Sequence, residues 1–191
     1  MNEAGCDEAG RGCVAGPVVA AAVILPDGFT HPLLVDSKTL SEKHREEARI
    51  IVVENALAWK IAWVSPEMID RINILNASIL AMHHALDGLQ IVPRHIVVDG
   101  NRFKPWNTDV DYQTVVKGDG KLANIAAASI LAKTFRDDMM KKLHIALPMY
   151  AFDENKGYPT KRHLDTISAI GPSPWHRFTF KGVMKEPSLF D

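Results

Sequence analysis

The chain has 191 residues, of which 47% are hydrophobic and 24% are charged, and its net charge is -1. These values are typical of a single globular domain, and no stretch approaches the roughly 20 apolar residues that a membrane span requires. The first residues lack the basic and then apolar segments of a signal peptide, so we expect a cytoplasmic location. Cys6 and Cys13 are the only cysteines. They have no histidine partners nearby, so we expect reduced, buried thiols rather than a zinc site.

Charge is distributed unevenly along the chain. Residues 1–116 contain 10 Lys and Arg against 15 Asp and Glu, and residues 117–191 contain 12 against 8, which gives -5 and +4 within the total of -1. An acidic part that holds metal and a basic part that binds phosphate would produce this pattern. Ordinary variation in surface charge would produce it equally well.

Apolar runs and turn signals predict strands and helices in a regular order. Short apolar or β-branched runs between turn residues predict strands, and apolar residues at helical spacing after a serine or threonine predict helices. In chain order, the predicted elements are strands over 4–8 and 17–25, a helix from Ser41, a strand over 58–64, an N-cap at Ser65 followed by proline, a helix over 77–89, strands over 96–98 and 112–116, a long helix over 121–147 and a short helix over 160–169.

This order predicts an α/β protein. An antiparallel pair followed by strands that alternate with helices is typical of a mixed sheet flanked by helices. Pro148 ends the long helix, and the residues after it are expected to form a small helical extension. We therefore expect a catalytic domain over 1–148, with a C-terminal helical extension and tail over 149–191 packed on it.

Four acidic residues share one structural position. Asp7, Glu8, Asp99 and Asp119 each lie at or next to the predicted end of a strand, close to a glycine. Strand ends of an open α/β sheet diverge and leave a crevice, and clustered carboxylates suit Mg²⁺ or Mn²⁺. Four such ligands are enough for two ions, which stabilise the attacking and leaving oxygens in phosphodiester cleavage. The pattern therefore predicts a metal-dependent nuclease site.

Each acid also has a structural interpretation. Asp119 could cap the long helix, Asp99 could form a turn with the glycine that follows it, and Glu8 could be a surface residue. Asp7 is harder to explain in this way, because an acid between Cys6 and an apolar strand needs a partner or a metal. Neighbouring strand residues point to opposite faces, so we expect the first strand to bulge or end at Glu8.

The loop Gly10-Arg11-Gly12 follows the first two acids. Two glycines allow backbone groups to approach a ligand closely, and backbone groups can test the ribose 2′-hydroxyl that distinguishes RNA from DNA. Arg11 could bind phosphate, or it could pair with a nearby acid and hold the loop in place.

Further motifs occur along the chain in a characteristic order. They are CDEAGRG (6–12), AGPV (15–18), DSKTLS (36–41), NILNA (73–77), VDGN (98–101), KGD (117–119), AASILAK (127–133), RD (136–137), KGYPT (156–160) and HR (176–177). Together they resemble the ribonuclease HII family, the type 2 ribonucleases H, over nearly the whole chain.

The resemblance implies a ribonuclease H-like fold with a C-terminal helical extension. It also implies an endonuclease that cuts RNA in RNA/DNA hybrids and single ribonucleotides in duplex DNA, with a role in ribonucleotide removal. Cleavage is expected on the 5′ side of the ribonucleotide, leaving 3′-hydroxyl and 5′-phosphate ends. In the family, residues matching Asp7, Glu8, Asp99 and Asp119 bind two metal ions, Mn²⁺ or Mg²⁺.

The resemblance also assigns substrate contacts. Residues matching Gly10, Arg11 and Gly12 contact the nucleotides around the cut and sense the 2′-hydroxyl. The tyrosine matching Tyr158 packs on the sugar of the next deoxynucleotide, where an aromatic face displaces no polar group. Ser37, Lys38, Asn76 and Lys133, with Ser129, are expected to contact phosphate, and Asp137 is expected to be structural. The metal mechanism needs no histidine, so core or surface roles are expected for His83, His84, His163 and His176.

The C-terminal tail suggests a partner. Ser188-Leu189-Phe190 resembles the end of a bacterial sliding-clamp peptide, although Glu186 stands where glutamine is usual and three-residue matches are common by chance. A weak clamp contact through this tail is the expectation, and the protein itself is expected to be a monomer.

Three other functions compete with the nuclease. The sister family ribonuclease HIII carries an extra N-terminal domain, for which the six residues before Asp7 leave no room. A nucleic-acid binding module without chemistry would not need all four acids. A structural Ca²⁺ site would predict metal-dependent melting without cleavage.

Overall fold

The computed structural model describes residues 2–184 and contains a five-stranded sheet in the order β3-β2-β1-β4-β5. β2 pairs antiparallel with both β1 and β3, whereas β4 runs parallel to β1, and β5 runs parallel to β4. The sheet is therefore mixed, as the order of elements predicts. The strands are β1 (Glu3–Ala9), β2 (Val18–Ile24), β3 (Ala58–Val64), β4 (His95–Asp99) and β5 (Asp111–Val115).

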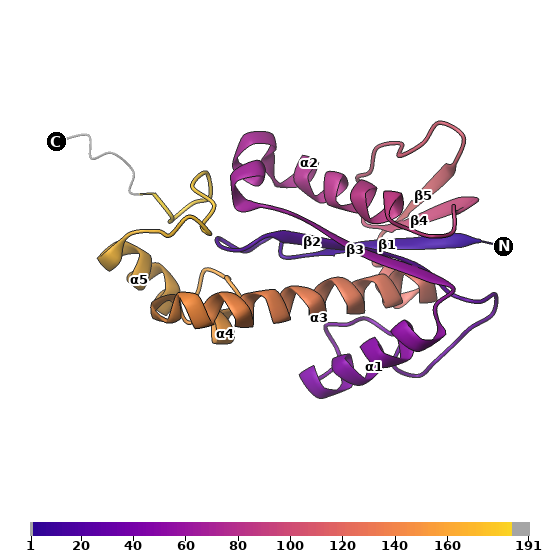
Figure 1. Cartoon of the computed structure of the whole chain (residues 1–191), viewed down its shortest axis with the longest axis horizontal. Helices are drawn as coiled ribbons and strands as arrows, with labels where there is room; N and C mark the ends of the chain where they lie inside the picture. The colour runs from indigo at the N-terminus through magenta and orange to yellow at the C-terminus, as the bar shows by residue number, and fades with distance from the viewer. Residues whose placement is uncertain (1, 185–191) are drawn as a thin grey trace.

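Helices cover both faces of the sheet (Figure 1). α2 packs on one face and α3 on the other, and α1 packs against α3. β2 is buried along its whole length because alternate residues contribute to the two cores, with Ala20 on the α2 side and Ala21 on the α3 side. The helices are α1 (Glu42–Asn55), α2 (Pro66–Asp87) and α3 (Ala123–Ala146).

The start of α3 lies very close to the sheet. Its first turns are rich in alanine, and small residues let a helix pack tightly. A side chain at Gly5 in β1 would overlap the backbone of Asn124. This close packing brings the N-terminal part of α3, and the turn before it, next to the end of β1.

Two details differ from the sequence-based expectations. α2 starts after the predicted cap at Ser65 and consists of two helical segments that meet at a kink at Asn73, where φ is 63° and ψ is 164°, so helical structure begins well before the predicted range 77–89. β1 neither bulges nor ends at Glu8, because Asp7, Glu8 and Ala9 pair in unbroken register with β2. The expected bulge is therefore wrong: the strand ends one residue later, and the chain turns at Gly10, where φ is 93°.

The C-terminal extension packs around the far end of α3 (Figure 1). It contains a 3₁₀ turn, the short helix α4 (Phe152–Asn155) and α5 (Lys161–Ile170), which Thr160 caps as predicted. Its core includes Val14 and Met140 from the preceding part of the chain. Within the described residues, no helix is both long and apolar enough to cross a membrane.

Candidate active site

The divergence of β1 and β4 places two of the predicted acids side by side. The parallel pairing ends at Cys6 and Val98, whose side chains both pack into the core beneath α2. Asp7 and Asp99 are the next residues of the two strands, so alternation directs both toward the opposite face, where α3 lies. β1 and β4 therefore separate at the position of these two carboxylates.

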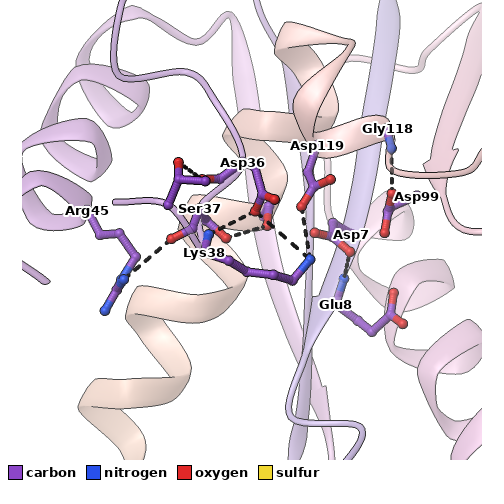
Figure 2. A network of polar contacts seen from close by, with 11 residues as sticks. Asp7, Glu8, Asp36, Ser37, Lys38, Arg45, Asp99, Gly118 and Asp119 are labelled. Atoms are coloured by element: carbon purple, nitrogen blue, oxygen red, sulfur yellow. Dashed lines mark hydrogen bonds and ion pairs between the residues drawn. The ribbon is translucent and has the colours of Figure 1, made fainter. Parts of the chain in front are cut away.

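Asp119 reaches the same region from a 3₁₀ turn that precedes α3. The Gly118 N–H donates a 2.7 Å hydrogen bond to Asp99 Oδ1, which ties this turn to the end of β4. The N-cap position of α3 is Leu122, without a side-chain cap, so Asp119 does not cap the long helix. Figure 2 shows the side chains of the four acids around the end of β1.

The first two acids are largely withdrawn from water. Asp7 is 6% exposed, and burial, followed by the charges of Glu8 and Asp99, raises its pKa well above the ordinary value. Burial also raises the pKa of Glu8, although Arg11 opposes this shift. The fold thus holds carboxylates together at an electrostatic cost, an arrangement that is common at functional sites.

Cationic groups and backbone N–H groups partner these acids. Lys38 Nζ lies 3.2 Å from Asp119 Oδ2, and Arg11 Nη1 lies 3.0 Å from Glu8 Oε1. Asp7 accepts a hydrogen bond from the backbone N–H of Glu8 at 2.7 Å (Figure 2). The structure thus shows the pairing of Arg11 with an acid, one of the two roles considered for this arginine.

The donor set fits a hard divalent cation. Carboxylate oxygens are the ligands that Mg²⁺ and Mn²⁺ prefer, and a cation would relieve the repulsion that raises the pKa of Asp7. Within residues 2–184, however, no group of three or more His, Cys, Asp or Glu side chains is arranged to hold one ion as the side chains lie. Binding would therefore require the carboxylates to turn away from their present partners.

A cleft of about 610 Å³ opens beside the end of β1. Asp99 does not line this cleft, and Asp119 lines a neighbouring pocket of about 200 Å³. Asn76 lies elsewhere, on α2, where its side chain bonds to Ile72 and Lys104. The predicted residues that do line the cleft are Asp7, Glu8, Gly10, Arg11, Gly12, Ser37, Lys38, Lys133 and Tyr158, with Ser129.

The two glycines of the loop differ in what the fold requires of them. Gly10 has a positive φ, and a side chain there would overlap Arg136. Gly12 does not have a positive φ, and the nearest atom to a methyl group there is a ring carbon of Tyr158 at 4.0 Å. The fold therefore requires a glycine at position 10, whereas position 12 is open toward the cleft.

Two buried arginines donate hydrogen bonds to backbone carbonyls in and around the loop. Arg136 donates to the carbonyls of Ala15, Pro17 and Lys156. Arg177 donates to the carbonyls of Arg11 and Gly16. Carbonyl partners satisfy the donors without neutralising the charge, so both guanidiniums add positive potential beneath the cleft.

The rest of the cleft lining contains both cations and acids. Lys38, Arg45, Lys133 and Lys156, here called the basic wall, line the cleft together with Glu42, Asp137, Asp153 and Glu154. Lys133 is half-buried, and burial followed by the charge of Arg45 lowers its pKa. Arg45 and Lys156 also line the cleft, and neither was selected from the sequence as a site residue. Asp137, expected to be structural, lines it as well, and burial raises its pKa. The cations of the basic wall suit a phosphate-bearing strand.

Comparisons with known proteins identify the family. Residues 4–183 match the sequence model of the family Ribonuclease HII. The chain is 60% identical over 180 residues to the ribonuclease HII of Bacteroides fragilis, which covers 94% of this chain and 89% of that protein.

Solved structures are similar over almost the whole chain. The ribonuclease H2 from Pyrococcus horikoshii OT3 gives a TM-score of 0.80 at 27% identity, covering 96% of this chain and 95% of that chain. The PCNA:RNase HII complex from Archaeoglobus fulgidus gives a TM-score of 0.78 at 26% identity, covering 100% of this chain and 99% of that chain.

The predicted resemblance and the predicted ribonuclease H-like fold are both confirmed. The family match spans the sheet, the cleft and the C-terminal extension, so it includes every element described above. The chain belongs to the ribonuclease HII family and is therefore an endoribonuclease that acts on RNA in RNA/DNA hybrids.

Proposed function

We propose that this ribonuclease H also cuts on the 5′ side of ribonucleotides embedded in duplex DNA, by two-metal-ion catalysis, and so takes part in their removal. The observation that carries the proposal is one cleft in which Asp7 and Glu8 adjoin both the loop Gly10-Arg11-Gly12 and the half-exposed ring of Tyr158. The loop and the ring offer contacts to a ribose on one side of a junction and a deoxyribose on the other.

The roles of the chain's own groups follow from their chemistry. Two divalent ions, Mg²⁺ or Mn²⁺, bound by Asp7, Glu8, Asp99 and Asp119 would activate a water and stabilise the leaving oxygen. Backbone groups at Gly12 approach the 2′-hydroxyl because no side chain stands between them and the cleft.

The basic wall orients the backbone of the cleaved strand. Lys38 and Lys133 line the cleft and would hold phosphates on either side of the scissile bond. Ser37 shares a hydrogen bond of 3.0 Å with Ser129, so its hydroxyl is held in a fixed place at the same wall. The Tyr158 ring would pack on the sugar of the following deoxynucleotide, which offers it no polar group to leave unsatisfied.

The proposal extends to the enzyme's cellular location, oligomeric state and partner. We expect the enzyme in the cytoplasm, where its nucleic-acid substrates lie, and acting as a monomer, since one chain supplies every group named above. The relative from Archaeoglobus fulgidus was solved as a PCNA:RNase HII complex, which supports a sliding-clamp contact here as well. The tail expected to make this contact, Ser188-Leu189-Phe190, lies outside the described residues.

The test uses three duplexes of identical sequence: all-DNA, DNA with one ribonucleotide, and an RNA/DNA hybrid. In Mg²⁺ or Mn²⁺ we expect cuts in the second and third only, with the single-ribonucleotide product ending in a 3′-hydroxyl on the 5′ side of the ribose. The control variant Asp99→Asn keeps the shape of the side chain and should cut neither the single-ribonucleotide duplex nor the hybrid. Cleavage of the hybrid alone would refute the single-ribonucleotide activity, and an undiminished Asp99→Asn rate would refute the metal mechanism.

A further inference from the structure

Two histidines are fully buried where α5 meets the segment that follows it. His163 Nε2 lies 3.1 Å from His176 Nε2, and both side chains have no exposed surface. The rings of Tyr150 and Phe152 pack around them. The nuclease chemistry proposed above uses neither histidine, so the pair needs another explanation.

The hydrogen bonds of the pair have a defined direction. The backbone N–H of Ser173 lies 2.9 Å from His176 Nδ1 and can only donate, so this nitrogen accepts. The Ser173 hydroxyl, also 2.9 Å from Nδ1, can donate to it, whereas the Ser173 carbonyl is farther away at 3.3 Å and accepts the His176 backbone N–H. His176 therefore carries its proton on Nε2 and donates it to His163 Nε2.

The same donor-to-acceptor order of hydrogen bonds continues from His163 to the backbone of a residue that lines the cleft. With Nε2 accepting, neutral His163 carries its proton on Nδ1, which lies 2.8 Å from the Tyr158 carbonyl. That carbonyl also accepts the backbone N–H of Thr160 at 2.9 Å. The chain of donors thus runs from Ser173 through both imidazoles and ends at the backbone of Tyr158, the residue whose ring faces the cleft.

Neutral imidazoles are required at both positions. A second proton on His163 would place two donors against each other at the Nε2–Nε2 contact, and a second proton on His176 would set Nδ1–H against the Ser173 N–H. Burial lowers the pKa of both histidines, and the adjacent His163 lowers that of His176 further, to about 4. The fold therefore keeps the chain of hydrogen bonds intact at neutral pH.

We propose that His163, oriented by His176, is a positioning residue that fixes the Tyr158 ring for the sugar of the deoxynucleotide and so sets selectivity for the RNA–DNA junction. The proposal rests on the substrate role proposed above for Tyr158. A continuous hybrid presents no deoxyribose on the cleaved strand, so its cleavage does not depend on that contact. Misplacing the ring should therefore lower cleavage at a single ribonucleotide more than cleavage of a hybrid.

Two substitutions at one position separate positioning from simple packing. In His163→Asn, the amide nitrogen falls near the place of Nδ1 and keeps the donor to Tyr158, but the acceptor for His176 is lost. In His163→Gln, the amide oxygen falls near the place of Nε2 and keeps the acceptor for His176, but the donor to Tyr158 is lost. Each variant removes one buried hydrogen bond, so a purely structural role predicts equal effects of the two.

The measurement is kcat/KM on the single-ribonucleotide duplex divided by kcat/KM on the hybrid, with melting temperatures recorded in parallel. We expect His163→Gln to lower this ratio about 10-fold and His163→Asn to leave it within about 2-fold of the unsubstituted enzyme. Tyr158→Ala should lower the ratio as well, and adding His163→Gln to it should lower the ratio no further.

Equal ratios for the two His163 variants would overturn the inference, as would an additive double variant or a Tyr158→Ala enzyme with an unchanged ratio. In each of these cases the unsubstituted enzyme still cuts at the single ribonucleotide, so the proposed function stands. Failure of the unsubstituted enzyme to cut that duplex would instead refute the proposed function, and this inference with it.

Discussion

The ammonium of Lys38 lies 3.2 Å from the carboxylate of Asp119, although the lysine side chain is 72% exposed and the aspartate side chain is 3% exposed. An exposed cation thus reaches a buried acid that we expect to bind metal. The two cations would compete for the same oxygens, because a carboxylate that accepts an ammonium has fewer lone pairs for a metal.

Replacing Lys38 with alanine should therefore tighten metal binding by the free enzyme. We expect the Kd for Mn²⁺, measured by calorimetry without nucleic acid, to fall by about 2-fold to 5-fold, since an exposed ion pair is worth up to about 1 kcal/mol. The matched control is Lys133→Ala, which removes a lysine of the same cleft that has no ion pair with these acids in the part of the chain that the structure describes. Equal or weaker metal binding in Lys38→Ala would contradict the competition.

Asp7→Asn should separate stability from activity. Burial and the charges of Glu8 and Asp99 disfavour the ionised Asp7 side chain, whereas an amide of the same shape keeps an oxygen for the Glu8 N–H. Without metal, we expect the variant to be about 1 kcal/mol more stable at pH 7 in denaturant unfolding. Its cleavage rate should fall more than about 100-fold, because a proposed ligand of the catalytic ions is lost. A destabilised variant would show that Asp7 has a stabilising partner within the folded chain.

The loop glycines should respond differently to alanine. Gly10→Ala forces a positive φ on a residue with a side chain and drives it into Arg136, so we expect a loss of about 2–3 kcal/mol in the free energy of unfolding. Gly12→Ala meets only the edge of Tyr158 and should change stability by less than about 0.5 kcal/mol. Its effect should instead appear in the ratio of cleavage at a ribonucleotide to cleavage of the hybrid. Equal destabilisation by both changes would refute this distinction.

The buried histidine pair should make stability depend on acid pH. The unfolded chain takes up a proton on each histidine near pH 6.5, whereas burial lowers the pKa of His176 in the folded protein to about 4. Between these values only the unfolded state gains the proton, so stability is lost as the pH falls through this window. His176 alone should account for about 3 kcal/mol.

The measurement compares unfolding free energies from pH 7 to pH 4 for the unsubstituted protein and for His176→Asn. The variant should be less stable at pH 7 but should lose less stability on acidification, because its side chain does not titrate. Acidic residues contribute to both curves, so the difference between the curves isolates the contribution of His176. His84→Asn, at a position that is 53% exposed, serves as the control. Parallel curves for the unsubstituted protein and His176→Asn would refute the prediction.

Much of the fold could be predicted because local signals and packing agree. Ser41 and Thr160 accept the capping hydrogen bonds expected of them, and the strand over 58–64 has the predicted bounds. The kink that divides α2 at Asn73 was not predicted, although asparagine is a common capping residue and its side chain accepts the Asn76 N–H at the start of the second segment. The unbroken register at Glu8 was also missed, because a twisted, diverging sheet edge can bring side chains from both faces of a strand toward one crevice.

Part of the site could be predicted, because residues at the ends of neighbouring parallel strands lie close together. Asp7 and Asp99 are neighbours because parallel strands bring their carboxyl ends to one edge. The partners of the cations could not be predicted in this way. Lys38 and Arg177 lie far from the acids in sequence, and the local sequence does not indicate which carbonyl or carboxylate either residue binds. Long-range side-chain partners of this kind depend on the assembled fold.

The segment after the loop is joined by backbone hydrogen bonds to the C-terminal extension. Val14 donates to Gly157, Gly16 donates to Trp175, and Arg177 donates to Val14. Arg177 also contacts the Gly16 carbonyl across 161 residues. During synthesis on the ribosome, the acids of β1 emerge early, whereas the partners that shape the substrate surface emerge last. A nascent or prematurely ended chain would thus possess the acids proposed to bind metal without the surface proposed to select the substrate.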